Sequence, residues 1–273
     1  MRSVMNITAD DRSRWINDGV VCIRDALPEP WLREAEKAWQ WSMDHPGPLA
    51  SPLTPGSSAR QDLCNPQALA HYQPLLERSP LKDMAQELMG SDNVWFMYEQ
   101  VFHKSAAGSP RTPWHQDTSY LAINGPQVLA MWISFEPIAE TAALEFVRGS
   151  HHGTLYNTSR FDADDETLPI FDSDDLPRLP AIEADRSAYD LVRFATQPGD
   201  IIAFHTSMLH GGGATDETTQ ERRTLTLRFF GDNAHFEQRP GPAGPFYEDI
   251  APHIVTGAPF RHERFLHLVG AGA

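Results

Sequence analysis

The clearest strand in the sequence is Arg222-Arg-Thr-Leu-Thr-Leu-Arg-Phe-Phe230, which ends at Gly231-Asp232. Successive side chains of a strand point to opposite faces, so one face of this segment carries Arg223, Leu225, Leu227 and Phe229 and is apolar beyond its first residue. The other face carries two arginines and two threonines: Arg222, Thr224, Thr226 and Arg228. Such a polar face either meets water or lines a site, and an arginine there is suited to bind a carboxylate through two parallel hydrogen bonds.

Further strands are predicted around this one, at 95–103, 128–135, 143–147, 191–195 and 200–204, where aromatic and β-branched residues concentrate. The first ninety residues have helical spacing instead, interrupted by a short strand at 20–23, and the first helix is predicted to begin at a Thr8 cap and to end at Gly19. We therefore expect a single domain, residues 1–273, in three parts: a helical flank at 1–92, a β core at 93–235 and an irregular C-terminal cover at 236–273.

Composition excludes several classes of protein. Of the 273 residues, 41% are hydrophobic and 22% charged, which is ordinary for a globular protein. The net charge of -15 argues against nucleic acid or an anionic membrane as the main partner. No apolar run is long enough to span a bilayer, and the two cysteines, Cys22 and Cys64, make no disulfide framework. We expect a cytoplasmic protein, and the sequence does not predict its oligomeric state.

A second informative stretch is Thr112-Pro-Trp-His-Gln-Asp-Thr118. If it is extended, His115 and Asp117 point to the same face, as two adjacent metal ligands would. His210, directly before three glycines, is the best candidate for a third ligand, because glycine leaves room for a close approach. Two histidines and one carboxylate form the facial triad of non-haem Fe(II) oxygenases, which leaves coordination positions open.

The segment between Arg160 and Arg178 contains seven acidic residues and no basic one: Asp162, Asp164, Asp165, Glu166, Asp172, Asp174 and Asp175. A charge block of this kind is typical of a solvated surface loop. A long insertion can also act as a lid over a site. The sequence leaves both interpretations open.

Several segments together resemble the phytanoyl-CoA dioxygenase family of Fe(II)- and 2-oxoglutarate-dependent oxygenases. They run in the family's order within residues 93–235: Trp114-His-Gln-Asp-Thr-Ser-Tyr120, Met131-Trp-Ile-Ser-Phe-Glu-Pro137, Ala143-Leu-Glu-Phe-Val-Arg-Gly-Ser-His151, Pro198-Gly-Asp200, His210-Gly-Gly-Gly213 and Arg222-Arg-Thr-Leu-Thr-Leu227. The resemblance implies a mainly β fold, a double-stranded β-helix or cupin-like jelly-roll barrel with flanking N-terminal helices. It also implies Fe(II) as the metal, with 2-oxoglutarate and dioxygen as co-substrates.

The resemblance also implies roles for individual residues. Those that match the metal ligands and the catalytic centre are His115, Asp117 and His210. Arg222 matches the arginine that pairs with the far carboxylate of 2-oxoglutarate. The other expected contacts of the co-substrate are Gln116, Trp132 and Lys104. Gly212 stands where some relatives have a serine that helps to hold 2-oxoglutarate, and Thr224 or Thr226 is the candidate to replace it. An intact Asp117 argues for hydroxylation, since related halogenases have a small residue there that frees a position for chloride.

The substrate cannot be derived from the sequence beyond a small molecule. Candidate pocket residues flank the motifs: Tyr120, Arg148, His151, His152, Phe161 and Phe246. The acidic segment disfavours a CoA thioester, because phosphates prefer basic surroundings. Three alternatives stay open: a non-redox enzyme that uses the same triad with another metal, a non-catalytic jelly-roll that binds a metal or small ligand, and an interaction protein that docks through its acidic segment.

Overall fold

Two antiparallel sheets form the centre of the molecule. The computed structural model describes residues 7–53, 59–104, 109, 111–162, 164–215, 221–242, 244–245 and 250–271. The large sheet has the order β1-β10-β7-β12-β4-β3-β2, and β14 also pairs with β4. Its strands are β1 (Val20–Ile23), β2 (Ser51–Pro52), β3 (Arg60–Leu63), β4 (Val94–Lys104), β7 (Val128–Ser134), β10 (Ile201–His205), β12 (Arg222–Phe230) and β14 (Leu266–Val269).

The small sheet faces the large one in the order β5-β11-β8-β9. Its strands are β5 (Thr112–His115), β8 (Leu144–Val147), β9 (Leu191–Arg193) and β11 (His210–Gly212). A separate pair joins β6 (Ile123–Asn124) to β13 (His235–Phe236). This arrangement is the expected mainly β, cupin-like jelly-roll, and all six strands predicted between residues 95 and 230 are present.

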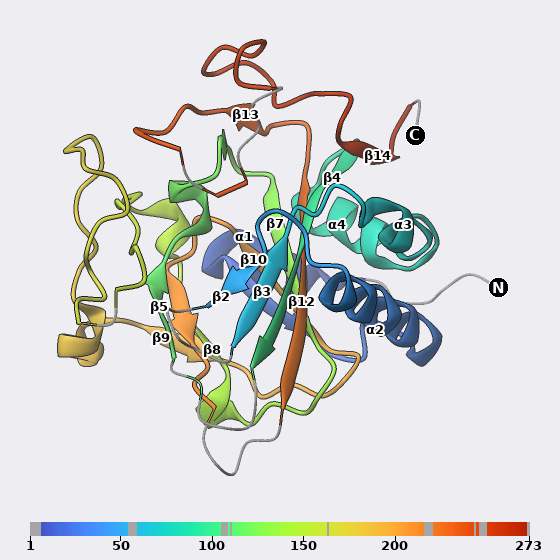
Figure 1. The fold of residues 1–273 in the computed structure, drawn as a ribbon, viewed down its shortest axis with the longest axis horizontal. Coiled ribbons are helices and arrows are strands. Elements are labelled where there is room, and N and C mark those ends of the chain that lie inside the picture. Colours follow the sequence, from blue (N-terminus) through green and yellow to red (C-terminus); the bar gives the residue numbers. More distant parts are fainter. Residues whose placement is uncertain are drawn as a thin grey trace.

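Four helices cover the outer face of the large sheet: α1 (Ala9–Asp18), α2 (Glu29–Asp44), α3 (Leu69–Arg78) and α4 (Leu81–Met89). Figure 1 shows α2, α3 and α4 on one side of the large sheet, with the small sheet on the other. The first helix begins at a capping box between Thr8 and Asp11 and ends at Gly19, whose φ of 77° is left-handed. The helices were thus correctly predicted from spacing and caps.

Strand β12 lies at the centre of the large sheet, between β7 and β4. Its apolar residues, Leu225, Leu227 and Phe229, belong to the core beneath the helices. Its polar face therefore points toward the small sheet, and Arg222 and Arg228 there are only 4% and 3% exposed. The sequence left open whether this polar face meets water or lines a site, and the structure shows that it is buried.

Both flanks contribute strands to the large sheet. Strand β1 pairs with β10, β3 pairs with β4, and β14 pairs with β4 near its start. The boundaries expected at 92 and 236 therefore do not delimit the sheet. Edge strands need partners for their backbone N–H and C=O groups, and residues from both flanks supply them here.

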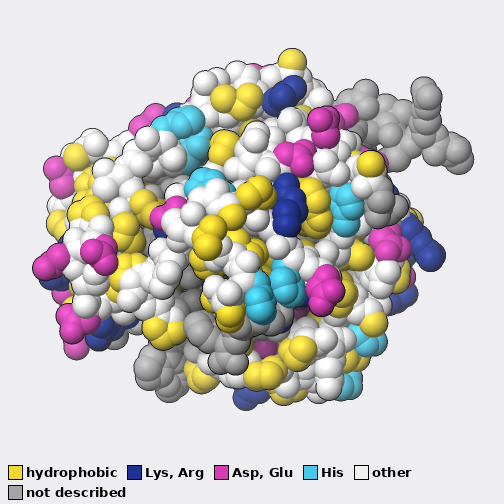
Figure 2. All heavy atoms as spheres, turned by 90° about the horizontal axis from the view of Figure 1, so that it is seen from above, with side chains coloured by type: hydrophobic (Ala, Val, Ile, Leu, Met, Phe, Trp, Pro, Cys, Tyr) yellow, Lys and Arg dark blue, Asp and Glu magenta, His cyan; other side chains and the backbone are white. Residues whose placement is uncertain are grey.

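The surface shows no single region of one charge on the face drawn in Figure 2, where acidic and basic side chains are dispersed among uncharged atoms. Among the helices that the structure describes, none is long and apolar enough to cross a bilayer.

Candidate metal centre

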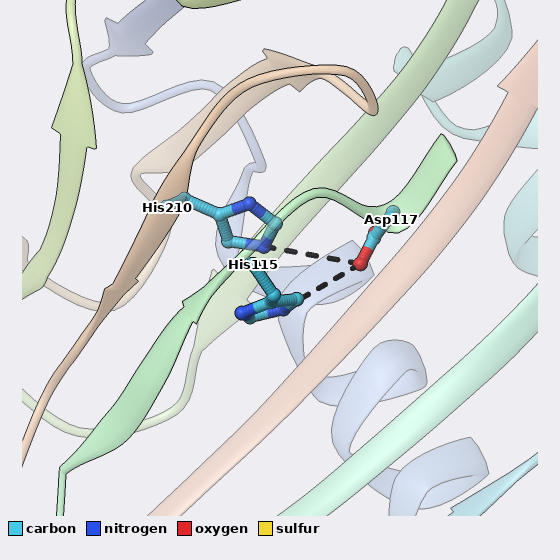
Figure 3. A group of neighbouring side chains, drawn as sticks. All are labelled: His115, Asp117 and His210. Carbon is cyan, nitrogen blue, oxygen red and sulfur yellow. Dashed lines mark ion pairs between the residues drawn. The ribbon is translucent and has the colours of Figure 1, made fainter. Parts of the chain in front are cut away.

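Three predicted ligands converge between the two sheets. His115 ends β5 and stands directly opposite His210 of β11 in the sheet register. Gln116 continues the extended chain, with φ -126° and ψ 122°, and Asp117 begins the short 3-10 helix η1 (Asp117–Ser119). All three side chains point toward one another (Figure 3). The extended geometry assumed for the His-x-Asp segment is thus present as far as Asp117.

The atoms that face one another suit a metal ion. Asp117 Oδ1 lies 3.6 Å from Nε2 of His115 and 3.9 Å from Nε2 of His210. The Nδ1 atoms lie 2.9 Å from the carbonyl oxygens of Pro113 and Met208, respectively. A carbonyl oxygen can only accept, so Nδ1 carries the proton in each ring and Nε2 offers its lone pair to the centre.

Burial sets the charge state of these groups. It lowers the pKa of His115 to about 3, with the neighbouring His210 as a further cause, and it also lowers the pKa of His210. Burial alone would raise the pKa of Asp117, but Arg228, His210, His115 and the hydrogen bond from Tyr120 together outweigh it and hold that pKa below its usual range. Two neutral imidazoles and one carboxylate are the donor set of Fe(II) oxygenase sites. Within the described residues, this is the one group found with three such donors close enough to hold an ion.

Asp117 also has two partners that the sequence did not predict. Its Oδ2 accepts hydrogen bonds from Nε and Nη2 of Arg228, at 3.1 and 2.7 Å. Its Oδ1 accepts one from the Tyr120 hydroxyl at 2.6 Å. The alternation of β12 placed Arg228 on the polar face, but nothing in the sequence indicated which carboxylate it would meet.

Arg222 lies at the other end of the same face and has no carboxylate within ion-pair distance in the part of the chain that the structure describes. Its Nη1 donates to the carbonyl of Ala142 at 2.8 Å and its Nη2 to that of Gly213 at 2.6 Å. Burial lowers the pKa of Arg222 to about 10. Gly213 has a φ of 75°, and a Cβ there would lie 2.7 Å from Nη2, so the glycine gives the guanidinium its place.

Lys104 stands opposite Arg222 in the register of β4 and β12. Its Nζ donates to the same carbonyl of Gly213, at 3.0 Å. Burial, with Arg222 and Arg111 nearby, lowers the pKa of Lys104 to about 7. Two cationic side chains thus converge on one carbonyl group, an arrangement that an incoming anion would relieve.

A cavity of about 320 Å³ connects the two ends of this face. The predicted contacts Lys104, Trp132 and Thr224 line it together with Arg222 and the three candidate ligands. Gln116 is not among the lining residues, although the resemblance implied a place there. Its amide donates to the carbonyl of Ser207 at 2.8 Å and accepts from the backbone N–H of Tyr156 at 2.8 Å, so it ties two loops together.

The acidic segment folds back over this cavity. The backbone N–H of Arg160 donates to the carbonyl oxygen of Leu168 at 2.9 Å, and that of Ile170 donates to the carbonyl oxygen of Thr158 at 2.8 Å. Phe161 and Ile170 line the cavity, and the Phe161 ring lies 5.1 Å from that of His115. The segment is therefore part of the cavity wall as well as a charged surface.

The candidate pocket residues divide into three groups. Tyr120 and Phe161 line the cavity. Arg148 pairs with Asp18 and Asp190. The rings of His151 and His152 contact the carbonyl of Ile16. These three candidate residues therefore lie outside the cavity. Phe246 lies outside the described residues.

Comparisons with known proteins agree with this geometry. The model of the family described as phytanoyl-CoA dioxygenase (PhyH) matches residues 15–224. No curated protein matches the sequence significantly.

Several solved structures have the same fold. The 2-oxoglutarate-dependent (alpha ketoglutarate dependent) non-heme epimerase SnoN of nogalamycin biosynthesis has a TM-score of 0.68 at 18% identity, covering 94% of each chain. The carbocyclase SnoK of the same biosynthesis has a TM-score of 0.69 at 17% identity, covering 97% of each. EctD from S. alaskensis, with 2-oxoglutarate and 5-hydroxyectoine, has a TM-score of 0.66 at 17% identity, covering 94% of this chain and 88% of EctD.

Proposed function

Since the chain belongs to the phytanoyl-CoA dioxygenase (PhyH) family of Fe(II)- and 2-oxoglutarate-dependent oxygenases, we propose that it hydroxylates an unactivated C–H bond of a small molecule. In that reaction one oxygen atom of dioxygen enters the substrate and the other enters succinate, while 2-oxoglutarate loses carbon dioxide. His115, Asp117 and His210 would hold the iron, which with its co-substrates supplies the oxidant. The carboxylate at position 117 favours this outcome over halogenation.

The observation that carries the proposal is the buried Arg222, which meets carbonyl oxygens and no described carboxylate in the cavity that contains the triad. A buried guanidinium without an anion is costly, so this position is suited to an incoming carboxylate. Arg222 would bind the far carboxylate of 2-oxoglutarate, with Lys104 and Thr224 beside it. The co-substrate is thereby oriented so that its other end reaches the triad.

The lining residues also indicate the chemistry of the substrate. Apolar side chains form much of the cavity beyond the triad: Leu49, Leu53, Leu63, Phe161 and Ile170. Gln100 and Gln61 add an amide pair, joined at 3.0 Å. Among the described lining residues, Asp117 is the one carboxylate, and Arg111 is paired with Glu166. A neutral, largely apolar molecule fits these walls better than a zwitterion or a CoA thioester.

The decisive experiment is anaerobic. Fe(II) and 2-oxoglutarate are added to the metal-free protein, and the weak visible charge-transfer band of the chelate is measured for the wild type, Arg222→Ala and His210→Ala. A band that both substitutions abolish supports the proposed site. No band, with folded protein and bound metal, would contradict it and favour the non-redox or ligand-binding alternatives.

The reaction outcome needs a separate test, because one fold supports many reactions and the similar structures include an epimerase and a carbocyclase. Neutral apolar compounds are screened by succinate release, and products are analysed after reaction with isotopically labelled dioxygen. Hydroxylation adds one labelled oxygen atom to the substrate. A product that has lost two hydrogens without gaining oxygen would contradict it.

A further inference from the structure

Asp117 is held by hydrogen bonds at both of its oxygens. Arg228 donates twice to Oδ2, and Tyr120 donates once to Oδ1. The Arg228 guanidinium is 3% exposed and lies over the ring of Tyr98, at 4.8 Å from its centroid. Its third nitrogen, Nη1, has no hydrogen-bond partner in the described part of the chain. The hydrogen bonds of this buried cation are therefore directed at a single oxygen of Asp117.

The two oxygens of the Asp117 carboxylate have different partners. The oxygen bound by Arg228 is Oδ2, whereas the oxygen that faces His115 and His210 is Oδ1. A turn of the carboxylate that brought both oxygens to one ion would break two charge-assisted hydrogen bonds inside a dry interior. The contact with Tyr120, three residues along the chain at the end of η1, fixes the carboxylate from the other side.

We propose that Arg228 and Tyr120 are positioning residues that present Asp117 to the metal through Oδ1 alone. A carboxylate that binds through one oxygen leaves a coordination position free that a two-oxygen carboxylate would fill, and the chelating co-substrate and dioxygen both need free positions. Both contacts are made by the protein's own side chains, so they orient this ligand for the metal. The inference rests on the metal site of the proposed function. Strand β12 would then hold the carboxylate ligand through Arg228 at one end and the co-substrate through Arg222 at the other.

Cobalt(II) is a suitable probe, since its visible absorption reports both binding and coordination number without turnover. Metal-free wild type, Arg228→Lys and Tyr120→Phe are titrated with cobalt(II), with Arg222→Lys as the matched control. Arg222 lies on the same face of the same strand and is equally buried. Arg228→Lys keeps the charge but cannot donate from two nitrogens at once. We expect it to weaken cobalt(II) binding by about 10- to 100-fold and to change the absorption bands.

The expected effect of Tyr120→Phe is smaller, a several-fold weakening in the same direction, and Arg222→Lys should leave the cobalt(II) affinity within about twofold of wild type. In an Asp117→Gly background, adding Arg228→Lys should cause no further loss, because Arg228 acts through Asp117. If Arg228→Lys does not fold, Tyr120→Phe decides the question.

Three results would overturn the inference. A folded Arg228→Lys with wild-type affinity and spectrum is one, and an equal loss of affinity with and without Asp117 is another, since it would show a general packing role. A wild type that binds no cobalt(II) is the third, and it alone would also contradict the metal site on which the proposed function rests.

Discussion

The two ends of the inner face of β12 present the same side chain in opposite electrostatic situations. Arg228 and Arg222 are almost equally buried, at 3% and 4% exposure. Burial alone would lower the pKa of Arg228, yet Asp117 together with Tyr98 and Tyr120 raises it above its ordinary value, whereas burial lowers the pKa of Arg222 to about 10. One end is neutral as a pair, and the other has a charge that no carboxylate among the described residues compensates. The comparison shows that one face of this strand has a buried ion pair at one end and, at the other, a buried guanidinium that meets only carbonyl oxygens among the described residues.

The largest expected difference between the two ends is in stability. Arg228→Met leaves the buried carboxylate of Asp117 without its cation, which should lower the free energy of unfolding of the metal-free protein by about 3–5 kcal/mol. Arg222→Met removes a buried charge that no described carboxylate compensates, so a loss of about 1 kcal/mol or less is expected. Denaturant unfolding with a metal chelator present measures both, and equal losses would refute the comparison.

Co-substrate use should show the reverse order. If Arg222 binds the far carboxylate of 2-oxoglutarate as proposed, Arg222→Met removes a charge-assisted contact worth about 1.5–3 kcal/mol, which corresponds to a KM for 2-oxoglutarate raised roughly 10- to 100-fold. Initial rates of succinate release against 2-oxoglutarate concentration test this. Arg222→Lys keeps a point charge, so its KM for 2-oxoglutarate should lie between those of the wild type and Arg222→Met. An unchanged KM would remove Arg222 from the co-substrate site.

The pH dependence of 2-oxoglutarate binding tests the role of Lys104, which lies beside Arg222 in the cavity. With its pKa lowered to about 7, Lys104 is protonated below pH 7 in the unliganded protein and loses its proton above it. Among the described residues, the charged groups that lower its pKa are Arg222 from β12 and Arg111 before β5, both cationic. A bound dianion favours protonated Lys104, so affinity should be full below pH 7 and fall about tenfold between pH 6 and pH 8.

Calorimetry on the manganese(II)-loaded protein measures this fall, and buffers of different ionisation enthalpy reveal the accompanying proton uptake. Lys104→Met should abolish the pH dependence while weakening binding at pH 6. A wild-type affinity that does not change between pH 6 and pH 8 would count against a role for Lys104.

The sequence was most informative where local pattern decides the structure. The alternation of β12 correctly separated Leu225 and Leu227, which pack beneath the helices, from the arginines that point inward. The cap at Thr8 and the left-handed Gly19 correctly bounded the first helix. Both are decided within a few neighbouring residues, so one sequence suffices.

The sequence was least informative where distant segments meet. Asp117 and Arg228 are 111 residues apart, and their pairing depends on the packing of the two sheets. Gln116 is equally instructive, since the residue between two candidate ligands was expected in the pocket but ties loops together instead. Short strands were also missed: β3 has four residues and exists because the edge of β4 offers hydrogen bonds.

A third arginine allows the comparison to be extended from the interior to the cavity mouth. Arg111 pairs with Glu166 of the acidic segment as Arg228 pairs with Asp117, but its side chain is 24% exposed and that of Glu166 is 34% exposed. Water screens such a pair, so Arg111→Gln should lower the free energy of unfolding by about 1 kcal/mol or less. The loss should shrink further at high salt, whereas that of Arg228→Met should not. Denaturant unfolding at low and high salt compares them. A loss as large as that of Arg228→Met would mean that compensation by a carboxylate, and not burial, determines what each arginine contributes.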